Sequence, residues 1–283
     1  MSFATHRFGA RLTDRGALRV PQVTVSFWLI KGLSTAMGEA TSDFLVHAIA
    51  PQLAVLAGFA VFMIALVVQF SRARYVAWAY WFAVAMVGVF GTMAADVLHV
   101  ALGVPYTAST ILYGLLLAAI FFTWWRTEGT LSIHSIDTPR REAFYWAAVV
   151  ATFAMGTALG DFTAYTARLG YFTSALVFAL MICVPGIGYR WLGWNPIFAF
   201  WFGYVMTRPL GASIADGLGK PRDVSGLGWG SGPVAAGFSA LIVVFVAYLT
   251  ITRADVQPSA SDHPLPGRHI GAELREIPPQ DVS

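Results

Sequence analysis

Charged residues are scarce in this chain, and cysteine is almost absent. Only 12% of its 283 residues are charged and 57% are hydrophobic, and the mean hydropathy is +0.64. Because soluble domains carry about 25% charged residues, this composition excludes a soluble globular fold and predicts a membrane protein. The single cysteine, Cys183, excludes a disulfide framework and any CxxC metal or redox site. We interpret it as a small apolar packing residue.

Long apolar runs dominate the chain instead. A helix needs about twenty apolar residues to cross roughly 30 Å of hydrocarbon. Runs of this kind can be placed at 22–42, 50–70, 76–97, 106–125, 143–163, 171–190, 194–215 and 232–252. They are continuous and do not alternate with polar residues, which excludes a membrane β-barrel. The predicted fold class is therefore an all-α polytopic membrane protein with eight transmembrane helices.

An internal repeat organises these runs. Each copy has a tryptophan, a glycine ten residues later and an aspartate fifteen residues later, and the residue before each aspartate is small. The four copies contain Trp28, Gly38 and Asp43; Trp81, Gly91 and Asp96; Trp146, Gly156 and Asp161; and Trp201, Gly211 and Asp216. Two helices per copy give every copy the same orientation. We therefore expect four parallel two-helix repeats around a pseudo-symmetry axis.

Each repeated position has an expected role. The tryptophans begin the first, third, fifth and seventh helices and are predicted to be interfacial anchors in an aromatic belt. The glycines form small-xxx-small pairs with the residue before the aspartate, which predicts close helix packing. The other four helices carry few polar side chains, so we expect them to pack outside as a scaffold.

Five acids fall inside the apolar runs or directly after them, and all belong to the repeat: Glu39, Asp43, Asp96, Asp161 and Asp216. A carboxylate inside a membrane is costly and favours a functional site. The alternative is that each aspartate caps a neighbouring helix. We predict that the acids line a shared ion-binding or transport pocket.

Two cations also fall inside the runs, in the first and fourth copies. Lys31 and Arg208 are expected to neutralise Glu39 and an aspartate. Pro209 removes a backbone donor and is expected to kink or break the seventh helix.

Two histidines follow aspartates at helical spacing. His47 comes four residues after Asp43, and His99 comes three residues after Asp96. Carboxylate with imidazole suits manganese, iron or zinc, so both are candidate metal ligands. A bound divalent cation is the only cofactor that this pattern suggests.

Most of the Lys and Arg residues lie on the side of the predicted bundle that holds both termini. This bias places the termini in the cytoplasm, and the net charge of +3 therefore reports topology and not nucleic-acid binding. The N-terminus has no signal-peptide pattern. The predicted segments are a basic cytoplasmic stretch (1–21), a first membrane half (22–125), a cytoplasmic loop (126–142), a second membrane half (143–252) and a disordered cytoplasmic tail (253–283).

Three stretches carry a resemblance to a known family. They are residues 27–43, with FW, Lys, Thr, GE and Asp in order, GTALGD at 156–161 and TRPLGA at 207–212. Over roughly residues 22–252, the chain resembles a bacterial family of membrane proteins built from four tandem two-helix repeats, each with a characteristic tryptophan, whose function is unknown. The resemblance implies the repeat architecture and the bacterial plasma (inner) membrane, and it implies no activity.

The leading hypothesis is a transporter or exporter of a cation, a divalent metal such as manganese, with proton coupling left open. A cation channel with an aspartate ring is a related alternative. An intramembrane aspartyl enzyme is disfavoured, since Ala158 occupies the first glycine of the expected Gly-x-Gly-Asp pattern. A non-transporting sensor or assembly protein also stays open. The expected partners are the lipid bilayer and the cation, with a homo-oligomer not excluded.

Overall fold

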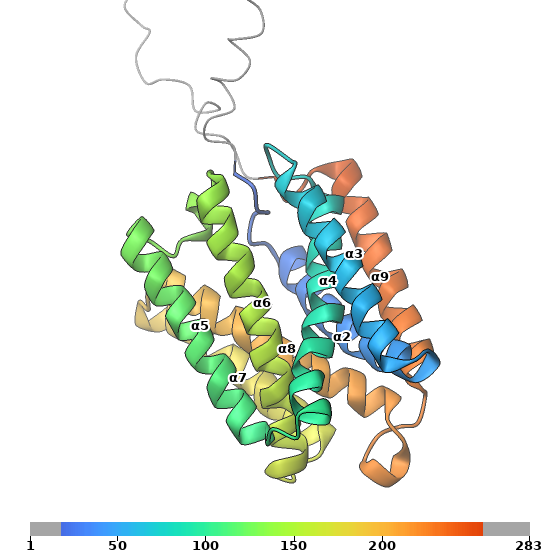
Figure 1. Ribbon diagram of the computed structural model, residues 1–283. Helices are drawn as coiled ribbons and strands as arrows, with labels where there is room; N and C mark the ends of the chain where they lie inside the picture. Colours follow the sequence, from blue (N-terminus) through green and yellow to red (C-terminus); the bar gives the residue numbers. More distant parts are fainter. Residues whose placement is uncertain (1–17, 257–283) are drawn as a thin grey trace, which may run out of the picture.

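The computed structural model describes residues 18–256, and within that range it is helical and has no strand. Figure 1 shows the helices in chain order. The eight long helices are α2 (Val25–Ala48), α3 (Pro51–Phe70), α4 (Ala77–Asp96), α5 (Tyr106–Glu128), α6 (Pro139–Asp161), α7 (Tyr171–Leu192), α8 (Pro196–Gly219) and α9 (Ser231–Thr252). Short helical turns are the π-helices η1 (Val97–Ala101) and η3 (Phe162–Thr166) and the 3-10 helices η2 (Ile133–Ser135) and η4 (Arg222–Val224). Residues 1–17 of the expected basic segment and 257–283 of the expected tail lie outside the described residues.

Each predicted run coincides with one long helix, and the differences are at the ends. The segment expected as a loop at 126–142 is shorter, because α5 continues to Glu128 and α6 begins at Pro139. Thr138 caps α6, its hydroxyl accepting a hydrogen bond from the amide of Arg141 at 3.3 Å. Six described helical segments are long and apolar enough to cross a membrane: Pro51–Phe70, Ala77–His99, Tyr106–Glu128, Pro139–Thr166, Tyr171–Leu192 and Ser231–Thr252. The long helices α2 and α8 are not among these six.

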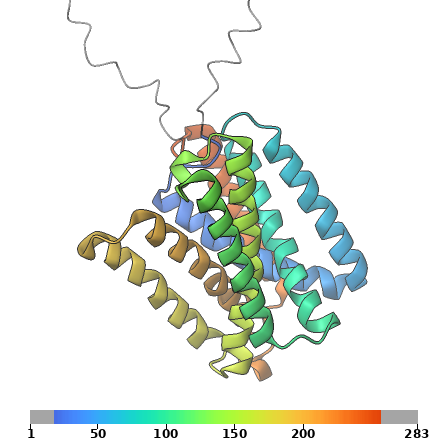
Figure 2. The ribbon, with the colours of Figure 1, turned by 60° about the vertical axis from the view of Figure 1, so that its left-hand side comes forward.

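The helices form an inner and an outer set. The inner helices α2, α4, α6 and α8 form a closed ring in which α2 and α6 each contact both α4 and α8. The outer helices α3, α5, α7 and α9 are mostly exposed, as expected of a scaffold. Each outer helix packs mainly on the inner helix that follows it, and α9 packs on α2. The last helix therefore returns to the first, and both ends of the described chain lie at one end of the molecule (Figures 1 and 2).

The repeated glycines allow the inner helices to touch, which confirms their predicted packing role. A Cβ on Gly38 would lie 2.6 Å from the carbonyl carbon of Gly88 on α4, so no side chain fits there. Each glycine meets the residue that comes seven positions after the tryptophan of the next copy. The pairs are Gly38 with Gly88, Gly91 with Phe153, Gly156 with Arg208 and Gly211 with Thr35.

The repeated tryptophans are not a lipid-facing belt, and that expectation is wrong. Trp81, Trp146 and Trp201 are only 1%, 2% and 5% exposed, and Trp28 is half-buried. The reason is that the aromatic residue before each tryptophan packs on the tryptophan of the next copy. The ring-centroid distances are 5.6 Å for Phe27 and Trp81, 5.6 Å for Tyr80 and Trp146, 6.1 Å for Tyr145 and Trp201, and 5.7 Å for Phe200 and Trp28.

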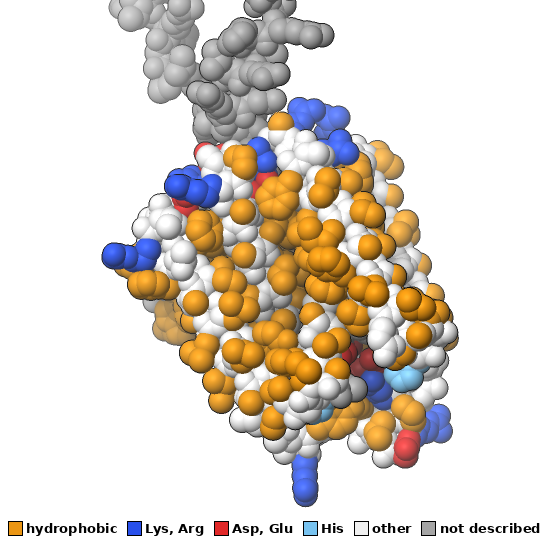
Figure 3. Space-filling model, in the orientation of Figure 1, with side chains coloured by type: hydrophobic (Ala, Val, Ile, Leu, Met, Phe, Trp, Pro, Cys, Tyr) orange, Lys and Arg blue, Asp and Glu red, His pale blue; other side chains and the backbone are white. Residues whose placement is uncertain are grey.

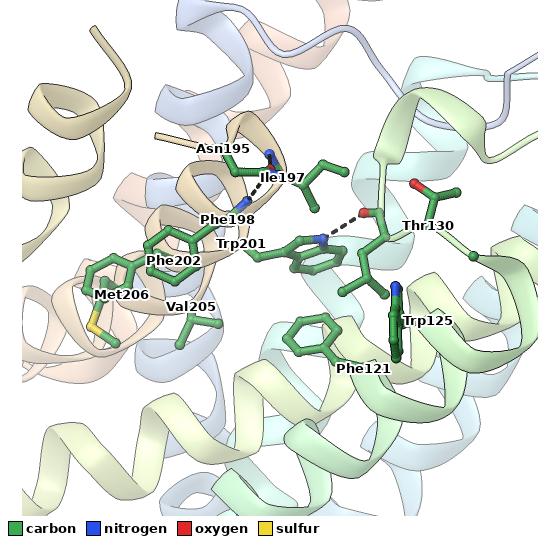
Figure 4. A pocket seen from close by; sticks show the side chains of 12 residues that line it. Phe121, Trp125, Thr130, Asn195, Ile197, Phe198, Trp201, Phe202, Val205 and Met206 are labelled. Atoms are coloured by element: carbon green, nitrogen blue, oxygen red, sulfur yellow. Dashed lines mark hydrogen bonds between the residues drawn. The ribbon is translucent and has the colours of Figure 1, made fainter. Parts of the chain in front are cut away.

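Trp201 shows how such a side chain is held. Its indole nitrogen donates a hydrogen bond of 2.9 Å to the backbone oxygen of Leu131, beyond the end of α5 (Figure 4). Its ring packs edge-to-face on Phe121 of α5, with centroids 4.8 Å apart. An apolar groove of about 610 Å³ lies beside it between α5 and α8 (Figure 4). Trp201 therefore joins an inner helix to an outer one instead of facing lipid.

Two single-residue expectations need correction. The predicted break at Pro209 does not occur, because helix α8 continues through this proline; a kink there stays a prediction. Cys183 is exposed on the outer helix α7, so it does not pack inside the protein.

The start and the end of the described chain are held together by buried polar groups. The amide of Gln22 donates a 2.8 Å hydrogen bond to the backbone oxygen of Asp255, and the Asp255 carboxylate accepts from the hydroxyl of Tyr75. Asp255 is 1% exposed. Residues 253–256 of the expected disordered tail are therefore an ordered part of the fold.

Candidate functional site

All five acids predicted from the repeat line one cavity. It has a volume of about 420 Å³ and lies where the C-terminal ends of the inner helices meet. Glu39 and Asp43 come from α2, Asp96 from α4, Asp161 from α6 and Asp216 from α8. In Figure 3, acidic, basic and histidine side chains meet in a hollow of an otherwise largely hydrophobic face. The fifteen-residue spacing brings these carboxylates to the same depth in every inner helix.

Asp96 and Asp161 are the two unpaired acids of the cavity. Neither side chain makes a hydrogen bond or ion pair with another described residue, and neither caps the π-helix that follows it. The alternative role as helix caps is therefore wrong for both. The chain widens into the π-helices η1 and η3 directly after these two residues, a feature that often accompanies functional sites.

Lys220 supplies a cation that lines the same cavity. Its ammonium group donates to the carboxylate of Asp43 and lies 3.8 Å from a carboxylate oxygen of Asp216. Burial lowers the pKa of Lys220, but the carboxylates of Asp216 and Asp43 raise it more, so the net pKa is above its ordinary value. Lys220 therefore remains an ammonium ion at neutral pH.

Arg208 and Glu39 form a buried ion pair at the centre of the inner ring. The Arg208 guanidinium donates to Glu39 at 2.7 Å, to Thr157 at 2.6 Å and to the hydroxyl of Thr92. It also donates to the backbone oxygen of Thr35 at 3.2 Å. All four inner helices thus converge on one guanidinium that is fully buried. The expected neutralisation of Glu39 by Arg208 is confirmed.

Lys31 has no carboxylate partner among the residues that the structure describes, so the predicted neutralisation of an acid by this residue is wrong. Its ammonium nitrogen is fully buried and donates no hydrogen bond to another described residue. It lies 4.1 Å from the ring centroid of Phe153 and 4.2 Å from that of Tyr204. The faces of these two aromatic rings replace an anion as its nearest partners.

The two histidines differ in position. His47 lines the cavity, with Nδ1 2.6 Å from the backbone oxygen of Asp43. His99 lies outside the lining; its Nδ1 is 2.7 Å from the backbone oxygen of Val104, and its ring stacks on Tyr106. No group of three or more His, Cys, Asp or Glu side chains that could hold a metal occurs among the described residues.

Sequence reasoning missed several buried or cavity-lining polar residues. No role was predicted for Lys220, and its position four residues after Asp216, directly after the end of α8, was the signal that could have found it. Thr92 and Thr157 occupy the repeat position that Glu39 has in the first copy, eleven residues after the tryptophan. Glu142 was assigned to a loop but is fully buried, with Arg19 at 2.6 Å.

The fold and the buried acids define a multi-pass helical membrane protein with an internal repeat. The chain belongs to the family of the Repeat of Unknown Function (DUF347), whose model matches residues 79–130, 144–192 and 199–255. The first copy, at residues 28–43, has the same frame and lies outside the matched residues. No curated protein matches the chain, and no solved structure does.

Proposed function

We propose that the chain crosses the bacterial plasma membrane eight times, as four parallel repeats around a central axis, with both termini in the cytoplasm. Two sets of contacts support the axis, because each connects every copy to the next and the fourth copy to the first. They are the glycine contacts and the aromatic pairs, which include Phe200 with Trp28. The distribution of cations supports the orientation. Described cations on the side of the termini are Arg19, Arg72, Arg74, Arg126, Arg140, Arg141, Arg190 and Arg253, against Arg168, Lys220 and Arg222 on the other.

Within this membrane frame, the proposed function is the transport or export of a cation through the acid cavity. The observation that carries the proposal is the convergence of five carboxylates from four helices on one cavity of about 420 Å³. Five acids face two cations, Arg208 and Lys220, so the ionised site has an excess of negative charge. Such a site inside a membrane is costly unless a positive ligand offsets the repulsion.

The centre of the bundle favours a transporter over an open channel. Arg208 fills the ring between the cavity and the aromatic layer formed by residues such as Trp81 and Tyr204. A fixed buried cation on the axis repels a permeating cation. Passage therefore requires the pair of Arg208 and Glu39 to rearrange, which is the behaviour of an alternating-access transporter.

The experiment is a flux measurement on purified protein in liposomes, with manganese as the first cation and a proton gradient as the first driving force. Asp161→Asn and Asp216→Asn are expected to abolish uptake, because each removes a carboxylate from the cavity. Asp223→Asn is the matched control, since Asp223 is exposed in η4 outside the cavity. Undiminished flux in both cavity variants at equal protein level contradicts the proposal; absence of any cation flux favours a sensor or assembly role.

A further inference from the structure

The acid cavity is much larger than a metal ion requires. Metal ions are held by a close shell of ligands at about 2.0–2.6 Å, and no such cluster occurs among the described residues. A volume of about 420 Å³ instead lies in the range of organic ligand sites, roughly 300–1,000 Å³. Apolar side chains, among them Val55 and Met93, line it together with the acids.

Two stacked tyrosines add a surface that suits an organic cation. Tyr106 and Tyr165 both line the cavity, with ring centroids 6.0 Å apart and planes within 11°. His99 stacks behind Tyr106, with centroids 3.6 Å apart, and Tyr171 hydrogen-bonds the hydroxyl of Tyr165. The rings are thus held in place beside the carboxylates. Aromatic faces attract ammonium groups, and such rings are a common part of amine-binding sites.

Lys220 shows that an alkylammonium group fits these carboxylates. Its side chain carries an ammonium group on an aliphatic stem and pairs with Asp43 and Asp216. Asp216 is only 6% exposed, yet its carboxylate makes no hydrogen bond to another described residue and its nearest cation is the 3.8 Å contact to Lys220. Asp96 and Asp161 make no hydrogen bond or ion pair with any other residue that the structure describes. Three carboxylates therefore face the cavity with unused acceptor capacity.

Lys220 also has room to move aside. It lines the acid cavity and a second cavity of about 240 Å³ that lies between α2, the end of α8 and the residues at 220–221 and 230–231. Asp43, His47 and Asp216 line both cavities as well. The Lys220 side chain therefore has open space on a second side, into which it can move when a ligand enters the first cavity.

We propose that the cavity binds an aliphatic amine with two or more ammonium groups and that Lys220 competes with it for Asp43 and Asp216. One ammonium group pairs with Asp96 and Asp161 beside the tyrosine stack, and another replaces Lys220. This substrate class rests on the proposed transport function, because both use the same cavity.

The first test measures binding by titration calorimetry on the full-length protein in detergent, with spermidine and with manganese chloride as probes. Spermidine binding that disappears in Asp161→Asn and persists in Asp223→Asn supports the proposal. Manganese binding that depends on Asp161 and that spermidine does not displace overturns the amine class and leaves cation transport standing. Failure of both probes to bind overturns the cation site itself and, with it, the proposed function.

The second test removes the competing ammonium. Lys220→Met keeps the unbranched side chain and deletes the charge, so spermidine is expected to bind roughly tenfold more tightly, which corresponds to about 1.4 kcal/mol. Arg222→Met removes a cation from the same loop, outside both cavities, and is expected to leave affinity unchanged. Equal or weaker spermidine binding in Lys220→Met contradicts the competition.

Discussion

The first and last copies of the repeat differ from the two central copies in the charges that they carry. Between the tryptophan and the aspartate of each copy, helices α2 and α8 contribute every cation and the extra acid, namely Lys31, Glu39 and Arg208, and α8 leads directly into Lys220. Over the same stretch, helices α4 and α6 contribute only their single aspartates, each followed by a π-helix. One frame therefore supports two kinds of helix, with ion pairs on one side of the ring and unpaired carboxylates on the other.

The position eleven residues after each tryptophan shows how this division arises. It is Glu39 in the first copy, Thr92 and Thr157 in the central copies and Ala212 in the last. The glutamate and both threonines contact Arg208. Because the fourth copy closes on the first, residues far apart in the chain can share one charge. The central copies need only hydroxyls at this position, since the charge they solvate is already paired.

Removing the charge of Arg208 is expected to have the largest effect on stability. Arg208→Met leaves Glu39 buried without a cation, and breaking a buried ion pair in this way costs about 3–5 kcal/mol. The free energy of unfolding of purified protein in detergent measures the loss. The double variant Glu39→Gln with Arg208→Met is expected to regain most of it, because no buried charge then remains.

Thr157→Val serves as the central-copy control for Arg208. It removes one hydroxyl partner of the guanidinium and keeps the charge pair, so a loss of about 0.5–1.5 kcal/mol is expected. If Thr157→Val lowers the free energy of unfolding as much as Arg208→Met does, the charge pair contributes no more than a single hydroxyl partner. That result contradicts the proposed difference between the terminal and the central copies.

An added methyl group at the contact between a terminal and a central copy is expected to have an intermediate effect. Gly38→Ala places a Cβ 2.6 Å from the backbone of Gly88, which must move, at a cost of about 1–3 kcal/mol. Gly32→Ala on the same helix has open space around its Cβ and is expected to be neutral or stabilising by up to about 1 kcal/mol. Thermal unfolding of both variants in detergent compares them, and equal effects refute close packing at Gly38.

Neutralising a central aspartate is expected to have the smallest effect on stability. Asp96→Asn and Asp161→Asn break no contact with a described residue, so the unfolding free energy should change by no more than about 0.5 kcal/mol. Asp43→Asn loses its ion pair with the partly exposed Lys220 and should cost up to about 1 kcal/mol. Chemical unfolding ranks the three. A large loss in Asp96→Asn indicates a structural role and weakens the site assignment.

Sequence reasoning found the helices because continuous apolar runs leave few other ways to satisfy the backbone in a membrane. It found Asp96 and Asp161 as cavity residues because their spacing repeats. It placed Trp81 at the lipid interface because the sequence gives the position of a residue along its helix. The sequence does not give the direction of that side chain relative to the neighbouring helices. It missed the burial of Glu142 for a related reason, because its cation, Arg19, lies 123 positions away.

By itself, the sequence determined the helical class, the repeat and the depth of each acid, because these depend on composition and on spacing within one helix. Only the tertiary structure decided which charges are paired. Ring closure sets the fourth helix pair against the first, and this brings Arg208 to Glu39 and Lys220 to Asp43, while Lys31 meets aromatic rings instead of an acid. Coulomb interactions weaken with distance, so a charge pairs with the group that lies next to it in the folded protein. These neighbours come from distant parts of the chain, and the local sequence does not reveal them.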